Sequence, residues 1–371
     1  MDGATLHITN GDAAAGLLHA AGLGGQVLPW RDVLHDGPVP GGHTLESLSD
    51  LRAGFLAGAF AQDRAAVRAD MAARDAVLRR AGSFAAVVLW FEHDLYDQLQ
   101  VLQVLDALAD TLADTLADTL ADTLADTLTN DPAARDRLSL VCIDRFPGVT
   151  PFQGLGQLSP AQMASLWPAR RPVTTAQVDL ARAAWRAFTA PDPAPLDALR
   201  HGDTAALPFL GPALDRLAAE YPGAGDGLPA TERGILAAAA GGRAGPVDLF
   251  RDHQAREAAP FMGDWSFWTR VAGLCAGPHP LLATADGAPF RHPPGAGPGP
   301  AFRGQVLALT GAGRRVLSGA ADAVDLNGFD RWIGGVHLTP GTGGPDWRPD
   351  WRPDWRPDWR HDPAADAIRH R

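Results

Sequence analysis

The 371-residue sequence contains no lysine, because all 32 of its basic residues are arginine. This absence excludes Schiff-base chemistry on a lysine and the lysine of a phosphate-binding loop. We attribute it to codon bias rather than to function. Cysteine is also scarce: Cys142 and Cys275 are the only two, and they lie far apart in the chain. A disulfide scaffold and a structural zinc knuckle are therefore both excluded.

Long apolar runs are missing as well. No uninterrupted apolar segment approaches the roughly 18 residues that a membrane span needs. No basic region followed by an apolar stretch stands at the N-terminus, so no secretory signal is visible. With 46% apolar and 20% charged residues, the composition is that of an ordinary globular protein. We therefore expect a cytoplasmic protein with no membrane contact and with two or three domains.

The acidic charge is concentrated in the first part of the chain. Up to residue 150, 21 Asp and Glu residues face 10 Arg, whereas 22 face 22 in the remainder. Phosphate backbones attract proteins through clustered basic side chains. An acidic first part is a poor match for that interaction, so we do not expect nucleic acid as a partner.

Two tandem repeats interrupt the sequence. Ala-Asp-Thr-Leu occurs five times over 109–128, and Asp-Trp-Arg-Pro recurs over 346–360. A four-residue period is close to one helical turn, so the first repeat predicts an over-long helix that begins near Leu95. A charged or partner-binding role for it is the less favoured alternative. Proline at every fourth residue excludes a helix from the second repeat, which predicts a disordered tail over 341–371.

Strand and helix patterns alternate over residues 1–150. Apolar segments predict strands over 6–9, 26–30, 85–91 and 138–143. The third of these is almost wholly apolar, as in a strand buried on both faces. Helical patterns separate the strands, over 13–21, 45–60, 63–81 and from about residue 95. This alternation predicts an α/β domain with a doubly wound, mostly parallel sheet.

The rest of the chain has a different pattern. Residues 151–225 predict a helical connecting segment, with helix starts at Ser159 and Thr174. Residues 226–340 predict a winged-helix-like domain, in which three helices precede two strands around a Pro- and Gly-rich stretch. The expected helices are 234–240, 247–254 and 264–274, the expected strands are 281–283 and 306–309, and a last helix follows residue 309.

Polar and ionisable side chains follow every predicted strand of the α/β domain. In a parallel sheet, ligands bind beyond the carboxyl ends of the strands, beside the point where the strand order reverses. Carboxylates clustered with histidine suit a hard divalent cation or an acid–base pair. We assign the candidates three roles: metal ligands Asp12, Asp32, Glu92, Asp94 and Asp144; catalytic groups His35, His93 and Asp97; and ligand-binding residues Asn10, Gly11, Arg31 and Gln98.

A structural explanation competes with this one for each single residue. Aspartate at a strand-to-helix turn is a routine helix N-cap, and both Asp12 and Asp94 stand where a cap is expected. The glycines at positions 11 and 16 have phosphate-loop spacing, but neither Lys nor Ser/Thr follows them. The remaining role for Gly11 is to let backbone N–H groups at the helix start bind an anion, and the signal for this role is weak.

The candidate recognition segment of the winged-helix-like domain does not resemble a DNA reader. Residues 263–270 hold three aromatic side chains, one Asp and one Arg. A groove-reading helix presents several Arg, Asn or Gln side chains to bases and phosphates. Aromatic residues at this spacing are typical of a core or a protein interface, so a protein partner is the expected use of this domain.

Several longer motifs carry a family resemblance. They are His7-Ile8-Thr9-Asn10-Gly11-Asp12, Trp30-Arg31-Asp32-Val33-Leu34-His35-Asp36-Gly37-Pro38, Glu92-His93-Asp94-Leu95-Tyr96-Asp97-Gln98-Leu99, Gly154-Leu155-Gly156-Gln157-Leu158, Pro260-Phe261-Met262-Gly263-Asp264 and Asp330-Arg331-Trp332-Ile333-Gly334-Gly335-Val336-His337-Leu338. Together they resemble the bacterial family built on domain of unknown function 1835, over about residues 5–340 without the repeats. The resemblance supplies a family and no activity. Both repeats depart from the family pattern.

Two functions from different classes fit the sequence. The leading hypothesis is a small-molecule or nucleotide-type ligand site at the strand ends, with hydrolysis assisted by a divalent metal, the one cofactor that the residues suggest. The alternative is a non-enzymatic regulator or interaction module that contacts a partner through the winged-helix-like domain.

Overall fold

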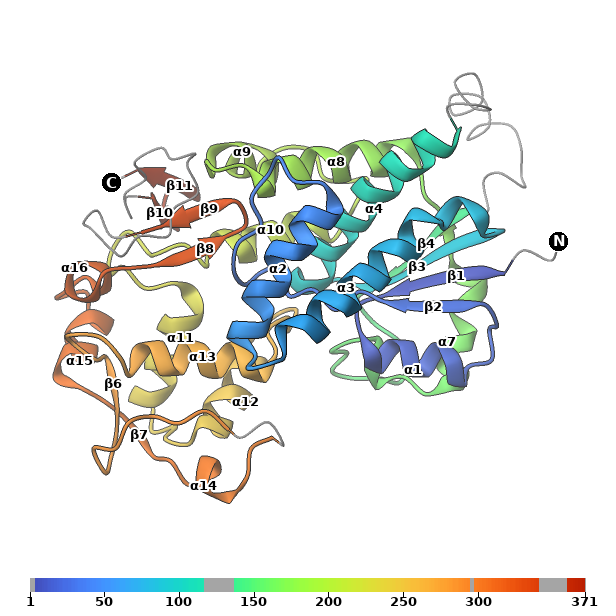
Figure 1. Cartoon of the computed structure of the whole chain (residues 1–371). Helices are drawn as coiled ribbons and strands as arrows, with labels where there is room; N and C mark the ends of the chain where they lie inside the picture. Colours follow the sequence, from blue (N-terminus) through green and yellow to red (C-terminus); the bar gives the residue numbers. More distant parts are fainter. Residues whose placement is uncertain (1–3, 117–136, 294–296, 340–358, 371) are drawn as a thin grey trace. The chain divides into compact units, whose positions relative to one another are not determined.

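The computed structural model describes residues 4–116, 137–293, 297–339 and 359–370, which form two compact units (Figure 1). Unit 1 comprises Met1–His35, Val39–Ala190 and Ala198–Leu214. Unit 2 comprises Asp36–Pro38, Pro191–Asp197 and Asp215–Arg371. Among the helices of the described ranges, none has both the length and the apolar character that crossing a bilayer requires.

Unit 1 is an α/β fold built on one five-stranded sheet in the order β2-β1-β3-β4-β5. The strands are β1 (Thr5–Thr9), β2 (Gln26–Pro29), β3 (Ala86–Glu92), β4 (Leu138–Ile143) and β5 (Arg171–Pro172). The first four are parallel, and β5 pairs antiparallel with β4. The doubly wound, mostly parallel sheet is confirmed. Strand β5 was not predicted, because two residues are too few to show a pattern.

Helices connect these strands and follow them. Those preceding β4 are α1 (Asp12–Ala20), α2 (Leu45–Ala59), α3 (Arg64–Arg79), η1 (Ala81–Ser83) and α4 (Leu95–Leu116). Those following it are η2 (Leu155–Gln157), α7 (Pro160–Ser165), η3 (Trp167–Ala169), α8 (Thr175–Thr189), α9 (Ala194–Arg200) and α10 (Leu210–Ala218). The predicted starts of α7 and α8 are confirmed, since Ser159 and Thr174 each form a capping box. The predicted helix through the first repeat is described only to Leu116, and residues 117–136 lie outside the described ranges.

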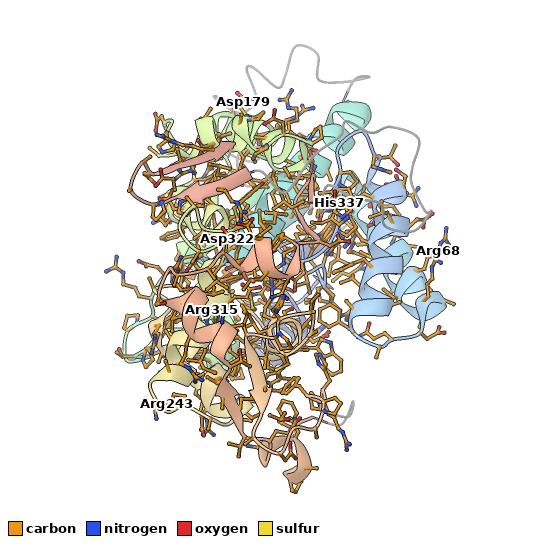
Figure 2. All side chains as sticks on the ribbon, turned by 90° about the vertical axis from the view of Figure 1, so that its left-hand side faces the viewer. Arg68, Asp179, Arg243, Arg315, Asp322 and His337 are labelled. Atoms are coloured by element: carbon orange, nitrogen blue, oxygen red, sulfur yellow. The ribbon has the colours of Figure 1, made fainter. Side chains whose placement is uncertain are left out.

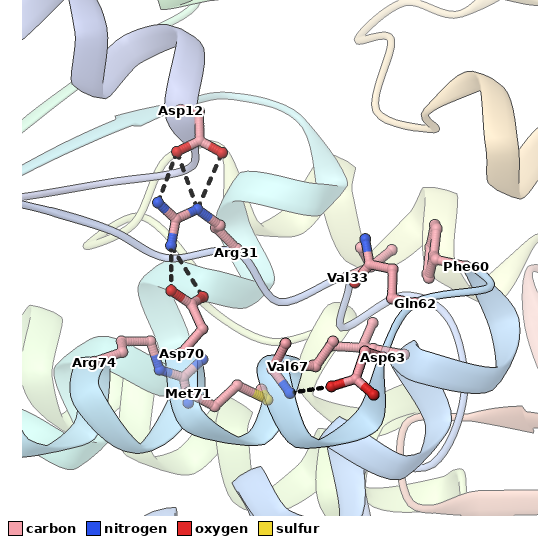
Figure 3. Close-up of a pocket in the computed structure, with 12 residues that line it drawn as sticks. Asp12, Arg31, Val33, Phe60, Gln62, Asp63, Val67, Asp70, Met71 and Arg74 are labelled. Carbon is pink, nitrogen blue, oxygen red and sulfur yellow. Dashed lines mark hydrogen bonds and ion pairs between the residues drawn. The ribbon is translucent and has the colours of Figure 1, made fainter. Parts of the chain in front are cut away.

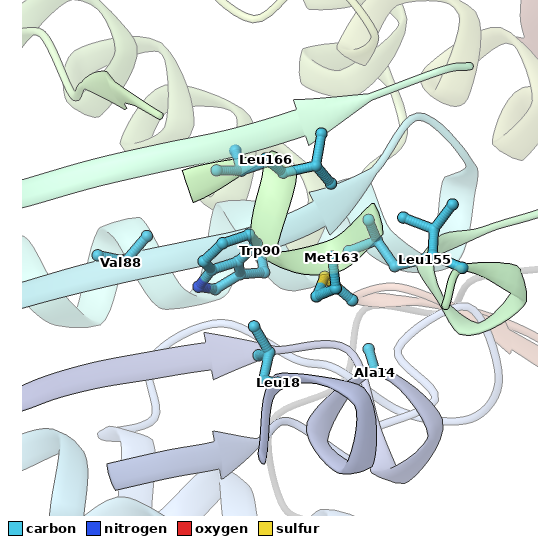
Figure 4. Packing of buried hydrophobic residues seen from close by; sticks show 9 residues of the cluster. Ala14, Leu18, Val88, Trp90, Leu155, Met163 and Leu166 are labelled. Carbon is cyan, nitrogen blue, oxygen red and sulfur yellow. The ribbon is translucent and has the colours of Figure 1, made fainter. Parts of the chain in front are cut away.

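The sheet is covered on both faces. In Figure 1, α1 and α7 lie on one face and α4 lies on the other. On the first face, Trp90 and Val88 of β3 pack with side chains from α1 and α7 (Figure 4). Residues Val87 to Glu92 of β3 are all buried, which explains why this strand is the most apolar run of the domain.

The strand order reverses at β1. Strand β2 pairs with one side of β1, and the chain then crosses to place β3 on the other side. The carboxyl ends of β1 and β3 therefore flank the topological switch point, where open α/β sheets bind ligands. Asn10 follows β1 there, and Glu92 is the last residue of β3.

Helices α2 and α3 form an antiparallel pair within the long connection from β2 to β3. Ala53 and Leu56 of α2 pack on Met71 of α3 and form a small hydrophobic cluster. Arg68 lies on the solvent side of this pair of helices (Figure 2). It forms an ion pair with Asp50 at 2.9 Å. This helical pair thus has a small core of its own.

Unit 2 contains helices and three small two-stranded antiparallel sheets among its described residues. Its first part has α11 (Ala230–Ala240), α12 (Pro246–Arg256), α13 (Asp264–Leu274), β6 (Leu282–Thr284), α14 (Pro300–Arg303), β7 (Leu307–Leu309) and α15 (Gly311–Leu317). Then follow α16 (Ala323–Asn327), β8 (Arg331–Ile333), β9 (Val336–Leu338), β10 (Trp359–Asp362) and β11 (Ala367–His370). The two strands expected at 281–283 and 306–309 are present as β6 and β7, and they pair antiparallel. The winged-helix assignment itself stays a prediction.

The end of the predicted disordered tail is ordered, which corrects that prediction for residues 359–370. Strands β10 and β11 form a hairpin. The fourth copy of the second repeat, which enters β10, has His361 where the earlier copies have proline. The His361 N–H donates to the Pro222 carbonyl, and the His361 carbonyl accepts from Ala224 N. A proline at position 361 would have no N–H to donate to the Pro222 carbonyl. Residues 340–358 lie outside the described ranges.

Candidate functional site

Three carboxylates come together at the switch point of unit 1. Glu92 ends β3, Asp94 is the residue before α4, and Asp97 lies in the first turn of that helix. One oxygen from each lies within 4.8 Å of the others. All three side chains are buried, with exposed fractions of 4%, 5% and 0%. We call these three residues the acidic cluster.

Hydrogen bonds fix the positions of the three carboxylates. Asp94 Oδ1 accepts from Asp97 N at 3.0 Å, so Asp94 is the cap predicted for this helix. Asp97 Oδ1 accepts from Glu92 N at 2.8 Å. The Asn10 side-chain amide donates to Asp97 Oδ2 at 2.8 Å and to Glu92 Oε1 at 3.1 Å. The amide after β1 thus connects to carboxylates on β3 and α4.

A loop that was not included among the predicted site residues completes the cluster. Leu155 N donates to Glu92 Oε1 at 2.5 Å. The neighbouring Gly154 has φ +154°, and a Cβ there would overlap the Glu92 carboxylate. The sequence offered one signal here, the motif Gly154-Leu155-Gly156-Gln157-Leu158, which was quoted for the family resemblance and given no role in the site. Because Gly154 and Leu155 lie far from β3 along the chain, the sequence did not indicate their contact with Glu92.

The electrostatic environment of the acidic cluster is unusual. Within the part of the chain that the structure describes, no Arg or His forms an ion pair with any of its members. Burial, and then the neighbouring Asp97, raise the pKa of Glu92 well above its ordinary value. Burial, then Asp97 and Glu92, do the same to the pKa of Asp94. Burial raises the pKa of Asp97 to about 7, against the hydrogen bond from Asn10. Such a cluster must hold protons or a cation near neutral pH.

The groups around the cluster are engaged in holding its backbone. Gln98, predicted to bind ligand, donates through Nε2 to the Glu92 carbonyl at 2.7 Å. The Cys142 thiol donates to the same carbonyl at 3.3 Å. Burial raises the pKa of this thiol, so it remains protonated and is not a nucleophile. The Tyr96 hydroxyl donates to the Asn10 carbonyl at 3.0 Å. Through its hydrogen bond to the Glu92 carbonyl, Gln98 positions the end of β3.

The two predicted catalytic histidines pack against aromatic rings. The His35 ring is buried and lies edge-on to Tyr96, with centroids 5.9 Å apart. The half-buried His93 ring has centroid distances of 6.2 Å to Phe152 and 6.0 Å to Phe209. Neither histidine belongs to the group of ligand atoms that defines the acidic cluster.

Asp12 and Arg31 are paired with each other instead of joining the cluster. The Arg31 guanidinium donates to both oxygens of Asp12 and to both oxygens of Asp70. The hydrogen bond from Arg31 lowers the pKa of Asp12. The expectation that Asp12 caps α1 is wrong, since Gly11 is the N-cap residue and no side chain caps this helix. The surroundings of Gly11 are open, because a Cβ there would meet no atom within 4 Å.

The two remaining predicted metal ligands are also paired with arginines. Asp32 is fully buried and receives 2.9 and 2.7 Å hydrogen bonds from Arg52. Asp144, at the end of β4, pairs with Arg145 at 3.1 Å. Of the five predicted metal ligands, only Glu92 and Asp94 lie in the acidic cluster, and the third member is Asp97, which was predicted to be catalytic. The strand ends are polar for different reasons and do not form a single site.

The composition of the cluster defines what it can hold. Carboxylate oxygens are the preferred ligands of Mg²⁺ and Ca²⁺. The Asn10 amide donates to Glu92 and Asp97 and keeps their orientation, but it adds no compensating charge. Without a cation, the cluster can act only as a set of carboxyls that share protons.

Comparison with known proteins adds no family. No protein-family model matches the chain, and no curated protein matches it. The resemblance to the family built on domain of unknown function 1835 therefore rests on the quoted motifs alone.

Proposed function

We propose that unit 1 binds a small, nucleotide-type molecule together with a divalent cation and hydrolyses it, in a cytoplasmic protein of the family built on domain of unknown function 1835. One observation carries this proposal: Glu92, Asp94 and Asp97 are buried within 4.8 Å of one another at the switch point. Among the described residues, no Arg or His forms an ion pair with any of the three.

A bound cation accounts for this arrangement at neutral pH. Burying several ionised carboxylates together is costly unless a positive charge compensates them. A divalent ion removes that cost and gives the cluster a chemical use, since it polarises a phosphoryl group or activates water. Mg²⁺ sites typically combine one or two carboxylates with substrate phosphates. A nucleotide-type ligand is thus the class of molecule that suits both the cluster and its place in the sheet.

The test is a thermal-shift panel on protein stripped with a chelator. Mg²⁺, Mn²⁺, Ca²⁺ and Zn²⁺ are each added with and without nucleoside triphosphates and sugar phosphates. A ligand at 100 times its dissociation constant adds about 2.7 kcal/mol to the free energy of unfolding, which is a shift of several degrees. We expect the shift to be lost in Asp94→Asn and Asp97→Asn and kept in Asp144→Asn, a carboxylate outside the cluster.

Turnover is then measured with the ligand that gives the largest shift. We expect release of phosphate that depends on the cation and is lost in Asp97→Asn. A panel without any shift contradicts the proposal. The three carboxyls would then share protons, and their role would be to cap the start of α4.

The second candidate is a regulatory or protein-interaction module with a winged-helix-like domain in unit 2. Its support is the element order, with α11, α12 and α13 preceding the antiparallel pair β6 and β7. Phe267 and Trp268 of α13 are buried, and Arg270 pairs with Asp36. The helix therefore offers little to DNA, and a protein partner is the preferred use of this domain. Binding of duplex DNA at low salt, with a steep loss on adding salt, would contradict this preference.

A further inference from the structure

A groove of about 610 Å³ lies in unit 1, apart from the residues of the acidic cluster (Figure 3). The first turn of α1, the residues after β2 and the pair α2–α3 contribute its walls. Ligand pockets in proteins typically enclose roughly 300 to 1,000 Å³. The groove thus has the size of a small-molecule site. It also accounts for Asp12 and Arg31, which the acidic cluster does not use.

The floor of the groove is apolar. Leu56 and Met71 are buried there, at the centre of the hydrophobic cluster between α2 and α3. Val33, Phe60 and Val67 are half-buried and pack against this cluster at the groove. The apolar side chains at the contact between α2 and α3 remain partly exposed on this floor. A ligand placed there would cover them.

The rim of the groove is acidic. Asp12, Asp63 and Asp70 line it, and the Asp12 and Asp70 side chains are 72% and 52% exposed. Arg31 bridges Asp12 and Asp70 through bidentate hydrogen bonds, so its guanidinium has little capacity left for an anion.

The second arginine at the groove does not offset the acidic rim. Arg74 pairs with Asp75 at 2.8 Å and stacks on Trp30, with its guanidinium carbon 3.9 Å from the ring centroid. Its charge is thereby used within the fold. With Arg31 as the remaining counter-charge to three carboxylates, the rim keeps an excess of negative charge.

We propose that this groove binds a small organic cation with an apolar body, of the aromatic or aliphatic amine class. The ammonium group lies at the carboxylate rim, beside Asp63, and the apolar body covers Phe60 and Val67. An ammonium near the Phe60 ring also gains from the cation–π interaction. This site requires neither a metal nor the acidic cluster, so it does not depend on the proposed hydrolytic function.

The test uses 2-phenylethylammonium as the probe, with 3-phenylpropionate and 2-phenylethanol as anionic and neutral analogues. Binding to the full chain is followed by isothermal titration calorimetry at low and high salt. We expect the ammonium to bind most tightly and to lose affinity as salt screens the rim. Asp63→Asn should weaken its binding about tenfold, which corresponds to one lost charge contact. Asparagine is as good an N-cap as aspartate, so α3 keeps its start.

Two further variants separate the possible outcomes. Phe60→Ala should weaken the ammonium and the neutral alcohol alike, because it removes part of the floor. Asp50→Asn, an exposed acid of α2 outside the groove lining, should leave binding unchanged. Asp97→Asn should also leave it unchanged, even where it abolishes a metal-dependent shift. Equal or tighter binding of the anion, no binding at millimolar probe, or an unchanged affinity in Asp63→Asn would overturn the proposal.

Discussion

Asn10 Nδ2 lies 2.8 Å from Asp97 Oδ2, so the amide that follows β1 is bonded to a carboxylate in the first turn of α4. The two residues are far apart in sequence and meet because β1 and β3 are neighbours in the sheet. This bond joins the two sides of the switch point. It is also the one side-chain amide contact that lowers the pKa of Asp97.

Replacing Asn10 with alanine should therefore destabilise unit 1 and increase the proton affinity of the cluster. Loss of a buried hydrogen bond to a carboxylate costs about 1–3 kcal/mol. The pKa of Asp97 should rise further, since a bond that favours its charged form is removed. Urea unfolding at pH 5 and pH 8 measures both effects. Asp144→Ala is the control, and an Asn10→Ala protein as stable as that control at pH 8 would contradict the assigned contact.

The metal-free protein should lose stability as the pH rises from about 4 to about 7. Asp97 has a pKa of about 7 when folded, against an ordinary value of 3.8. Over that interval the folded state binds more protons than the unfolded state, so deprotonation favours unfolding. The contribution of Asp97 to this loss is about 4 kcal/mol, and Glu92 and Asp94, whose pKa values are also raised, add to it. Chemical unfolding of wild type and Asp97→Asn with chelator present should show the slope in wild type and a reduced slope in the variant.

Gly154→Ala should disturb the cluster from the loop side. The new Cβ would overlap the Glu92 carboxylate, and the φ of +154° adds backbone strain. We expect a loss of about 1–3 kcal/mol in stability. The matched control is Gly148→Ala, where φ is +79° and a Cβ meets no atom within 4 Å. If both variants lose the same stability, backbone strain alone explains the effect and the close approach to Glu92 is irrelevant.

The buried pair of Asp32 and Arg52 should behave as a structural unit. Both side chains are 0% exposed, so removing one partner leaves a buried charge uncompensated. Arg52→Met should cost about 3–5 kcal/mol, and Asp32→Leu in the same chain should restore part of it. The exposed pair Arg68 and Asp50 serves as the comparison, where the same removal should cost no more than about 1 kcal/mol. Denaturant unfolding of the double-mutant cycles distinguishes the two cases.

His361→Pro should release the C-terminal hairpin of unit 2. The substitution restores the residue of the earlier repeat copies and removes the N–H that bonds to Pro222. We expect faster hydrogen exchange and proteolysis within β10 and β11, together with the loss of the bond from Ile368 N to Asp197. His361→Ala, which keeps the N–H, should preserve the hairpin. Equal protection in both variants would show that this backbone bond does not secure β10.

Local patterns were sufficient for most of the fold. The apolar run that became β3 and the capping residues Ser159 and Thr174 each carry their signal within a few positions. Strand β5 was missed because its pairing with β4 is long-range, and the hairpin of β10 and β11 was missed because its first strand begins inside the proline repeat. Proline in the second repeat predicted a disordered tail, but the last copy has histidine in place of proline and enters strand β10.

The candidate site was predictable only in part. Topology alone placed Asn10, Glu92 and Asp94 at one sheet edge, since parallel strands end together. It could not show that Asp12 and Asp32 are paired with arginines from other segments. Which carboxylate meets an arginine depends on how α2 and α3 fold over the strand ends. The contribution of Leu155 N depended on a loop that lies beyond β4 in the chain.

Helix α4 begins with its cap at the acidic cluster, and the chain re-enters the sheet as β4 at Leu138. Because β3 and β4 are parallel, that re-entry takes place at the opposite edge of the sheet. The two described copies of Ala-Asp-Thr-Leu, residues 109–116, therefore lie at the end of α4 that is remote from the acidic cluster. A split-protein junction or an inserted fluorescent reporter at Leu116, the last described residue of α4, should therefore leave the carboxylates of the cluster in place.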